Sequence, residues 1–286
     1  MITNWEEMRV YDHNYAYNDQ ISTTELFQLI MNITEKQTEQ YHQDGYCIIR
    51  NAIPKQDIDL LHNNCYKAID AIHDEMDRQG EDIIGITHRN KRYFVNNKSL
   101  EEKYDEMNEF IFGDVMAEIT SQLLGPDVYL FNEQFVVKSA HQGMSFSWHQ
   151  DSGYVGHPNH TPYLTCWIPL VDVDENNGTV FVLPFDQAGT REFVYHTRED
   201  GTNDNIGYHG ENKGFPVCVN RGDIVCFTSL TFHRSGANRT DRDRPVFVSQ
   251  YSPDMIKNEA GTELQHLAVP FIKNNQKCYS ETALAE

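Results

Sequence analysis

The chain has 286 residues, of which 39% are hydrophobic and 23% charged, an ordinary globular composition that allows one large domain with a sizeable core. Its 43 acidic against 23 basic residues give a formal net charge of −20, which disfavours nucleic acid and anionic membranes as partners and leaves a small molecule or a homo-oligomer open. No apolar run predicts a membrane helix, the acidic start MITNWEEMRVYDHN does not resemble a secretory signal, and the six cysteines form no CxxC pair. We therefore expect a cytoplasmic protein with reduced thiols.

The first third of the chain predicts helices. The segment STTELFQLIMNITEKQTEQYHQDG ends at Gly45, a suitable helix stop, and the YCII that follows predicts a short strand. A second helix is predicted after Pro54, because apolar residues recur there at spacings of three and four. This stripe consists of Ile58, Leu61, Cys65, Ala68, Ile72 and Met76. A third helix is predicted from Ser99, where SLEE fits a capping box, to Gly125.

The residues after Pro126 predict strands. Short β-branched and aromatic segments alternate with Gly, Pro, Asn and Asp, which is typical of an antiparallel sandwich or barrel. The segments are DVYLFNEQFVVK, PYLTCWIPLVDV, GTVFVLPF, GDIVCFTSLTFH and RPVFVSQY. We expect a mainly β fold and a single domain over 1–286, with helical support over about 1–125, a β core over 126–255 and a C-terminal extension over 256–286. The helices should pack against the outside of the β core.

The segment SFSWHQDSGYVGHPNH contains three histidines and an aspartate, all of them metal-ligand residue types. If His149 and Asp151 lie on one strand, both side chains point to the same face and Gln150 points away. His157 and His160 follow a glycine in a proline-containing stretch. We expect them to be loop or substrate-proximal residues and not ligands.

A third ligand has to come from a distant strand. His233 ends the apolar run IVCFTSLTFH, so a sheet would hold it rigidly. Two histidines and one carboxylate match the facial triad of non-haem Fe(II) oxygenases, which leaves three coordination positions open. Taken alone the pattern is weak, because the chain has 13 histidines and an HxD pair with a remote histidine often arises by chance.

Arg244 is the first residue of the predicted strand RPVFVSQY. If this strand lies beside the strand that contains His233, the Arg244 side chain should point into the barrel. A buried arginine needs an anionic partner, which can be a nearby aspartate or the carboxylate of a ligand held by two hydrogen bonds. Arg242, two residues earlier, is the alternative. Pro245 marks the start of the strand and favours Arg244 as the inward residue.

These segments resemble the phytanoyl-CoA dioxygenase-like (PhyH) family of Fe(II)/2-oxoglutarate-dependent oxygenases over about residues 37–252. QTEQYHQDGYCIIRNAIPKQDIDLL resembles the family's first helix, strand and next helix, and WHQD resembles its HxD motif, with Trp167 following His149 by 18 residues. NNGTVFVLP resembles a family strand. HRSGANRTDRDR resembles the distal histidine, with Ser, Asn, Thr and Arg two, five, seven and eleven residues after it.

The resemblance implies a double-stranded β-helix, a jelly-roll or cupin-like core braced by N-terminal helices. His149, Asp151 and His233 would hold Fe(II), O2 would take an open position, and Arg244 would bind the distal carboxylate of the cosubstrate 2-oxoglutarate. Ser235 or Thr240 would lie near that carboxylate, and Gln134 and Trp167 would line the cosubstrate pocket.

The reaction implied is hydroxylation of an unactivated C–H bond with release of succinate and CO2. Related halogenases have Ala or Gly in place of Asp151, so the carboxylate argues against halide chemistry. A zinc-dependent hydrolase or lyase could use the same three ligands, but it would not explain the spacing of Arg244 from His233. A non-enzymatic jelly-roll binding protein is a further alternative, and the intact ligand set argues against it.

The substrate is open among acyl-CoA thioesters, amino acids, osmolytes and secondary metabolites. The only marked basic cluster, HRNKRYF, is modest for binding the phosphates of coenzyme A. LPFDQAG departs from the family's turn, and the polar stretch 186–215 after it predicts a specialised substrate-facing loop. The aromatic residues Phe146, Trp148, Tyr154 and Tyr163 favour a compact polar or alkaloid-like metabolite. We expect natural-product tailoring.

Overall fold

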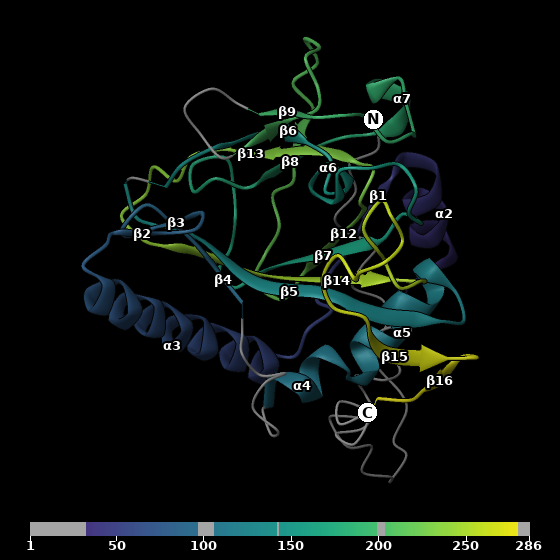
Figure 1. The fold of residues 1–286 in the computed structure, drawn as a ribbon, viewed down its shortest axis with the longest axis horizontal. Coiled ribbons are helices and arrows are strands. Elements are labelled where there is room, and N and C mark those ends of the chain that lie inside the picture. The colour runs from purple at the N-terminus through teal and green to yellow at the C-terminus, as the bar shows by residue number, and fades with distance from the viewer. Residues whose placement is uncertain (1–32, 97–105, 142, 199–203, 280–286) are drawn as a thin grey trace, which may run out of the picture. The chain divides into compact units, whose positions relative to one another are not determined.

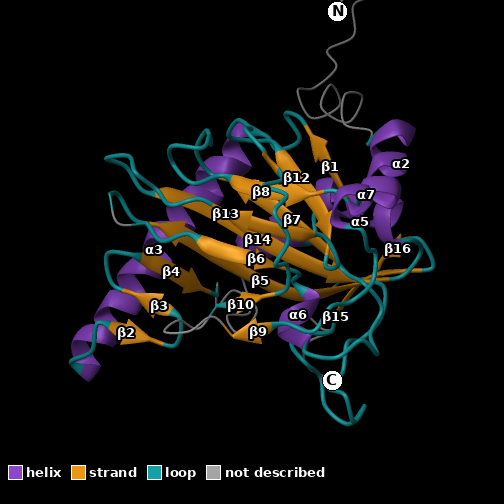
Figure 2. Cartoon of the chain, turned by 90° about the horizontal axis from the view of Figure 1, so that it is seen from above, coloured by secondary structure: helices purple, strands orange, loops and turns teal. Residues whose placement is uncertain are grey.

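Two antiparallel β-sheets form the centre of the computed structural model, which describes residues 33–96, 106–141, 143–198 and 204–279. The larger sheet has the strand order β1-β12-β7-β14-β5-β4-β3-β2, with β15 and β16 joined to it at β5. The smaller sheet has the order β11-β8-β13-β6, and β9 and β10 form a separate hairpin. Figure 1 shows the smaller sheet lying over the larger one, and Figure 2 shows the same two layers from above. The predicted jelly-roll, or double-stranded β-helix, is confirmed.

The elements follow one another with helices concentrated before β5. The helices are α2 (Glu35–Asp44), α3 (Lys55–Gln79), α4 (Glu106–Ile111), α5 (Asp114–Leu124), α6 (Ser152–Val155) and α7 (Phe185–Ala188). The first strands are β1 (Tyr46–Ile49), β2 (Ile83–Ile84), β3 (Thr87–His88), β4 (Arg92–Val95), β5 (Val128–Lys138), β6 (Phe146–His149), β7 (Leu164–Pro169) and β8 (Val180–Leu183). The later strands are β9 (Thr197–Arg198), β10 (Asn205–Ile206), β11 (Phe215–Pro216), β12 (Ile224–Thr228), β13 (Phe232–Ser235), β14 (Arg244–Ser252), β15 (Val269–Lys273) and β16 (Gln276–Lys277). No helix in these ranges is long and apolar enough to cross a membrane.

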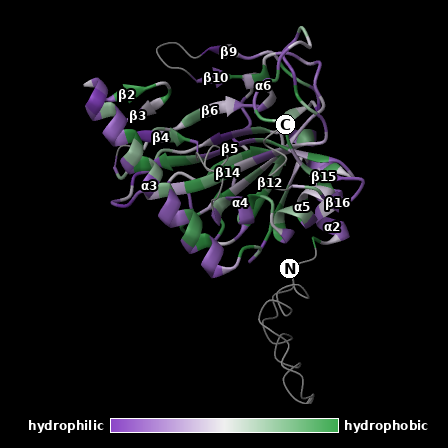
Figure 3. Cartoon of the chain, turned by 60° about the horizontal axis from the view of Figure 1, so that its bottom comes forward, coloured by the Kyte–Doolittle hydropathy of each residue, from purple (hydrophilic) through white to green (hydrophobic). Residues whose placement is uncertain are grey.

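The larger sheet has two faces because successive side chains along a strand point in opposite directions. On β14, Phe247 and Tyr251 pack with α3, α4 and α5 in a core outside the sheet, while Val246 and Val248 belong to a core between the sheets. Figure 1 shows these helices on the far side of the larger sheet from β6, β8 and β13. In Figure 3 the hydropathy alternates along α3, as one buried stripe requires. The prediction that helices brace the outside of the β core is confirmed.

The predicted helices differ from the observed ones in two places. Within the described residues the first predicted helix is α2, which begins at Glu35, so Ile33 and Thr34 are not helical as predicted. The first ends at Gly45, which takes a φ of 88°, and the stripe on α3 is buried or packed on the core as predicted. The third is interrupted: α4 ends before Phe112, and α5 begins after Gly113. A side chain at Gly113 would have its Cβ 2.5 Å from the Glu109 carbonyl oxygen, and the break lets Phe112 pack on Phe271. The predicted capping box at Ser99 lies outside the described residues.

The apolar run IVCFTSLTFH forms two strands, not one. β12 belongs to the larger sheet and β13 to the smaller, so the chain crosses between the sheets at Ser229–Thr231. The expectation that the Arg244 strand lies beside the His233 strand is therefore wrong, because β14 pairs with β5 and β7. Arg244 nevertheless faces the space between the sheets, from the sheet opposite His233.

Candidate metal centre and cavity

His149 and Asp151 are brought together by the end of a strand and not by a continuous strand. His149 is the last residue of β6, and Asp151 has helical backbone angles at the start of α6. The prediction that both lie on one strand is therefore wrong. The helical turn places Asp151 beside the strand end because it folds the chain back at Gln150. The Gln150 side chain does point away, donating to the carbonyl oxygens of Glu192 and Leu230.

His233 completes the cluster through the pairing of β13 with β6, which places it directly opposite His149. One ligand atom from each of His149, Asp151 and His233 lies within 4.8 Å of the other two. Oδ1 of Asp151 is 3.4 Å from Nε2 of His233 and 3.8 Å from Nε2 of His149. Among the described residues this is the one group of three or more His, Cys, Asp and Glu side chains close enough to hold a metal ion.

Both imidazoles present an unprotonated nitrogen to the same point. Nδ1 of His149 donates to the Ser147 carbonyl oxygen at 2.7 Å, and Nδ1 of His233 donates to the Thr231 carbonyl oxygen at 3.0 Å. The Nε2 lone pairs are therefore free to bind a metal. Burial and the neighbouring His233 lower the pKa of His149 to about 3, so its ring is neutral at neutral pH. Two imidazole nitrogens and a carboxylate oxygen form the donor set of a facial triad.

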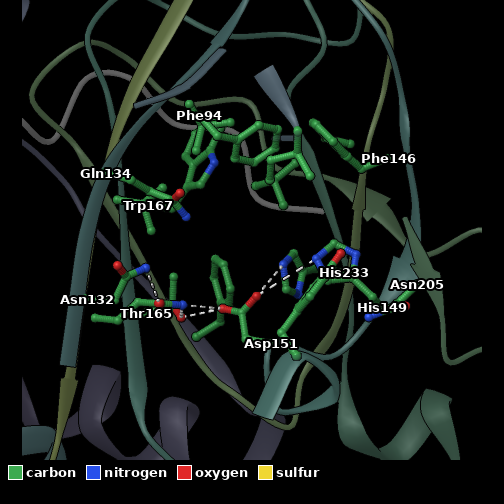
Figure 4. Close-up of a pocket in the computed structure, with 18 of the residues that line it drawn as sticks. Phe94, Asn132, Gln134, Phe146, His149, Asp151, Thr165, Trp167, Asn205 and His233 are labelled. Carbon is green, nitrogen blue, oxygen red and sulfur yellow. Dashed lines mark hydrogen bonds and ion pairs between the residues drawn. The ribbon is translucent and has the colours of Figure 1, made fainter. Parts of the chain in front are cut away.

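The cluster opens into a cavity of about 540 Å³ between the sheets. Its wall on the larger sheet consists of inward-facing side chains in rows that run across β7, β14 and β5. The row nearest Asp151 is Thr165, Gln250 and Asn132, and the next row is Trp167, Val248 and Gln134. Aromatic side chains make up much of the remaining lining: Phe94, Phe131, Phe146, Tyr154, Tyr163 and Phe227. Figure 4 shows the triad facing Thr165, Gln134 and Trp167 across this space.

Three buried cations form the row farthest from Asp151. Arg244 pairs with Lys138 across β14 and β5, and Lys138 pairs with Arg92 across β5 and β4. Arg92 donates to both carboxylate oxygens of Asp204, at 2.9 and 3.1 Å. Lys138 donates to Ser235 Oγ at 2.7 Å and to the Gly236 carbonyl oxygen. Of these three side chains, Arg244 is the one that lines the cavity.

Arg244 is 1% exposed, and within the described part of the chain it forms no ion pair and its Nε has no hydrogen-bond partner. Its hydrogen bond to the Val136 carbonyl oxygen is long, at 3.5 Å, and its guanidinium lies 5.7 Å from the centre of the Trp167 ring. Burial lowers its pKa to about 9. A buried guanidinium without an acid is costly, so this geometry is complementary to an anionic ligand.

The other predicted site residues fall into two groups. Ser235, Gln134 and Trp167 line the cavity. Thr240 does not line it, because its hydroxyl is held in the turn after β13 by Asn238 Oδ1 at 2.8 Å. The turn that follows the distal histidine needs this side chain for its own hydrogen bonds.

The cavity lining does not include Trp148, His157 or His160 of the segment SFSWHQDSGYVGHPNH. His157 contacts the Lys257 carbonyl oxygen at 2.9 Å, and His160 contacts Ser152 Oγ at 2.9 Å, so both hold the loop after α6. Trp148 points to the outer face of the smaller sheet, where the Arg234 guanidinium lies 5.2 Å from its ring. The prediction that Trp148 is one of the aromatic residues that face a substrate is therefore wrong.

The polar stretch 186–215 reaches the cavity, as predicted. Asp204 and Asn205 line it, and Nε2 of His196 accepts from the Gln150 backbone N–H at 2.8 Å. Residues 199–203 of this stretch lie outside the described residues. The Arg92–Asp204 pair joins residues 112 positions apart, and no local pattern in the sequence could have indicated it.

Replacing Asp204 with asparagine should destabilise the fold, because Arg92 would stay buried without its charge partner. Breaking a buried ion pair from one side costs about 3–5 kcal/mol, which corresponds to a fall in Tm on the order of 10 °C. Thermal unfolding measures it, with Glu75→Gln as the control, since that residue's pair with Arg78 is exposed. An unchanged Tm in Asp204→Asn would show that the pair contributes nothing.

Comparison with known proteins places most of the barrel, residues 41–246, in one family. The model of the family described as Phytanoyl-CoA dioxygenase (PhyH) matches residues 41–246. The peroxisomal phytanoyl-CoA dioxygenase of Homo sapiens is 25% identical over 236 residues, covering 77% of this chain and 68% of that protein. Two solved structures have a similar fold at 19% identity. The non-heme monooxygenase ThoJ has a TM-score of 0.62, over 87% of this chain and 92% of its own. The non-heme alpha ketoglutarate dependent carbocyclase SnoK from nogalamycin biosynthesis has a TM-score of 0.59, over 85% and 95%.

Proposed function

Because the chain belongs to the phytanoyl-CoA dioxygenase family of Fe(II)- and 2-oxoglutarate-dependent oxygenases, we propose that it hydroxylates an unactivated C–H bond of a small secondary metabolite. The observation that carries this proposal is the pairing of two sites in one cavity. A triad of His149, Asp151 and His233 lies at one end, and the unpaired guanidinium of Arg244 lies at the other.

The side chains present fit both Fe(II) and 2-oxoglutarate. The triad offers two imidazole nitrogens and one carboxylate oxygen, which suits ferrous iron and leaves coordination positions open. Arg244 offers the cation that a dicarboxylate needs at its distal end. When bound, iron and 2-oxoglutarate together supply the activation of O2 and the oxidising power, with succinate and CO2 as coproducts.

The chain's own residues bind the metal, the cosubstrate and the substrate and orient them. His149 and His233 each donate Nδ1–H to a backbone carbonyl oxygen, which orients the ring and directs Nε2 toward the metal position. Lys138 donates to Ser235 Oγ, which leaves the Ser235 hydroxyl proton free to be donated into the cavity. The aromatic lining excludes water and holds the apolar body of a substrate close to the triad.

A compact metabolite suits the cavity better than an acyl-CoA. Two of the cations in HRNKRYF are already paired: Arg89 with Asp77 and Asp82, and Arg92 with Asp204. These two arginines are therefore held in ion pairs and are not free to bind the phosphates of coenzyme A. The similar fold of SnoK, from nogalamycin biosynthesis, supports a role in natural-product tailoring. The six unpaired cysteines suit a reducing compartment, and we place the protein in the cytoplasm.

A substrate screen tests this proposal. Candidate metabolites are incubated with the protein, Fe(II), 2-oxoglutarate and O2, and succinate formation identifies those that turn over. Hydroxylation predicts a product that has gained one oxygen atom from isotopically labelled O2. A cyclised, epimerised or chlorinated product would contradict hydroxylation, while succinate formation would still establish the cosubstrate. Turnover of an acyl-CoA alone would contradict the proposed substrate class.

Lys138→Met should weaken 2-oxoglutarate binding about 10-fold, which corresponds to a loss of binding free energy on the order of 1.4 kcal/mol. The reason is that the variant removes both a basic side chain beside Arg244 and the donor that orients Ser235. Burial and the neighbouring Arg244 hold the pKa of Lys138 well below its usual range, so an arriving dicarboxylate favours the charged form. Titration of the metal-loaded protein with 2-oxoglutarate measures the affinity. Lys91→Met, at an exposed lysine on the turn before β4, is the matched control. Equal affinity in both variants would exclude this role.

A further inference from the structure

A row of polar side chains on the larger sheet connects the metal-facing carboxylate to the cavity wall. Gln250 on β14 lies opposite Thr165 on β7 and opposite Asn132 on β5. All three line the cavity, and none of them was singled out in the sequence. Figure 4 shows the hydrogen bonds that join Asn132 and Thr165, through this row, to Asp151.

The hydrogen bonds of this row use every polar group of the Gln250 carboxamide. Its Nε2 donates to Asp151 Oδ2 at 3.0 Å and to Thr165 Oγ1 at 3.0 Å, and its Oε1 accepts from Asn132 Nδ2 at 3.1 Å. Thr165 Oγ1 in turn donates to the same Asp151 Oδ2 at 2.5 Å. A flipped carboxamide would point Oε1 at the carboxylate and its NH2 at the Asn132 NH2, so the network fixes one orientation.

The two oxygens of Asp151 consequently have different surroundings. Oδ2 accepts from Thr165 and Gln250, two donors on the larger sheet. Oδ1 is the oxygen that approaches the Nε2 atoms of His149 and His233. A carboxylate whose second oxygen is held by two donors has only one oxygen to offer a metal ion.

We propose that Thr165 and Gln250 are positioning residues that hold Asp151 as a one-oxygen metal ligand, with Asn132 fixing the Gln250 carboxamide. This inference rests on the proposed metal centre. Its consequence is that Asp151 would supply one ligand atom to the metal and not two. Asn132 contacts Gln250 and not Asp151, so its contribution is smaller than those of Thr165 and Gln250.

Titration of the apo protein with Co(II), followed by its absorption spectrum, tests the proposal without turnover. Thr165→Val and Gln250→Met keep the side-chain size and remove the donors, and each should weaken Co(II) binding about 10- to 100-fold, the range for residues that orient metal ligands. Thr165→Ser keeps the hydroxyl and should bind within about threefold of the unmodified protein. Asn132→Leu should fall between these limits.

The outcomes separate this proposal from the proposed function. Unchanged Co(II) affinity in Thr165→Val and Gln250→Met, with thermal unfolding showing both folded, would overturn the positioning role. A loss in Thr165→Ser equal to that in Thr165→Val would also overturn it, because packing and not the hydroxyl would then be responsible. If the unmodified protein binds Co(II) no better than His233→Ala, the metal centre itself fails.

Discussion

Asp151→Ala is expected to weaken metal binding at the triad strongly and to abolish 2-oxoglutarate turnover. Metal affinities of about 10–16 kcal/mol for four-ligand protein sites correspond to about 2.5–4 kcal/mol per ligand, so losing one of three ligands should weaken binding roughly 10²- to 10³-fold. The variant also leaves the donors of Thr165 and Gln250 without their acceptor. Isothermal titration with Co(II) measures the affinity, and succinate formation measures turnover.

Asp186→Ala is the control for Asp151→Ala, because it removes an exposed aspartate in the first turn of α7. It should bind metal like the unmodified protein. Metal binding that survives in Asp151→Ala with unchanged affinity would show that the ion is held elsewhere.

Arg244→Leu is expected to weaken 2-oxoglutarate binding while leaving metal binding intact. Removing one partner of a buried, hydrogen-bonded charge pair costs about 2–5 kcal/mol, which is roughly a 30-fold loss or more in affinity. The ligand-free protein should not lose stability, since the variant replaces a buried guanidinium that forms no ion pair with an apolar side chain. A loss of ligand affinity without a loss of Tm distinguishes a binding residue from a structural one.

Arg242→Leu provides the matched control, because Arg242 lies two residues earlier and is exposed. Its 2-oxoglutarate affinity should match that of the unmodified protein. If Arg242→Leu lost affinity and Arg244→Leu did not, the assignment of the inward arginine would be wrong.

The residue types of the triad could be predicted from the sequence, but the local structure that positions them could not. The spacing of His149 and Asp151 suggested one strand, whereas β6 ends at His149 and a helical turn places the aspartate. Either geometry brings the side chains of residues i and i+2 near one point. A spacing of two therefore indicates proximity without defining the backbone.

The inward direction of Arg244 could also be predicted, because alternation along a strand depends only on where the strand begins. Its neighbours could not, since the pairing of β14 with β5 and β7 is a property of the whole barrel. The same alternation extended to Gln250, six residues later, would have indicated another inward side chain. Its bond to Asp151 needs the register of three strands, which a single sequence does not supply.

The interrupted third helix shows the limit of local propensity. Helical residues continue on both sides of Gly113, and Phe112 at the break packs against Phe271 and Tyr279. Tertiary packing decides such breaks.

The central claim is that one cavity binds Fe(II) and 2-oxoglutarate together. The most direct measurement is the visible absorption spectrum of the protein under anaerobic conditions as Fe(II) and then 2-oxoglutarate are added. We predict a charge-transfer band that needs both additions, is absent when Zn(II) replaces Fe(II), and disappears on admission of O2 with release of succinate. Protein that binds Fe(II) yet gives neither the band nor succinate would contradict the account.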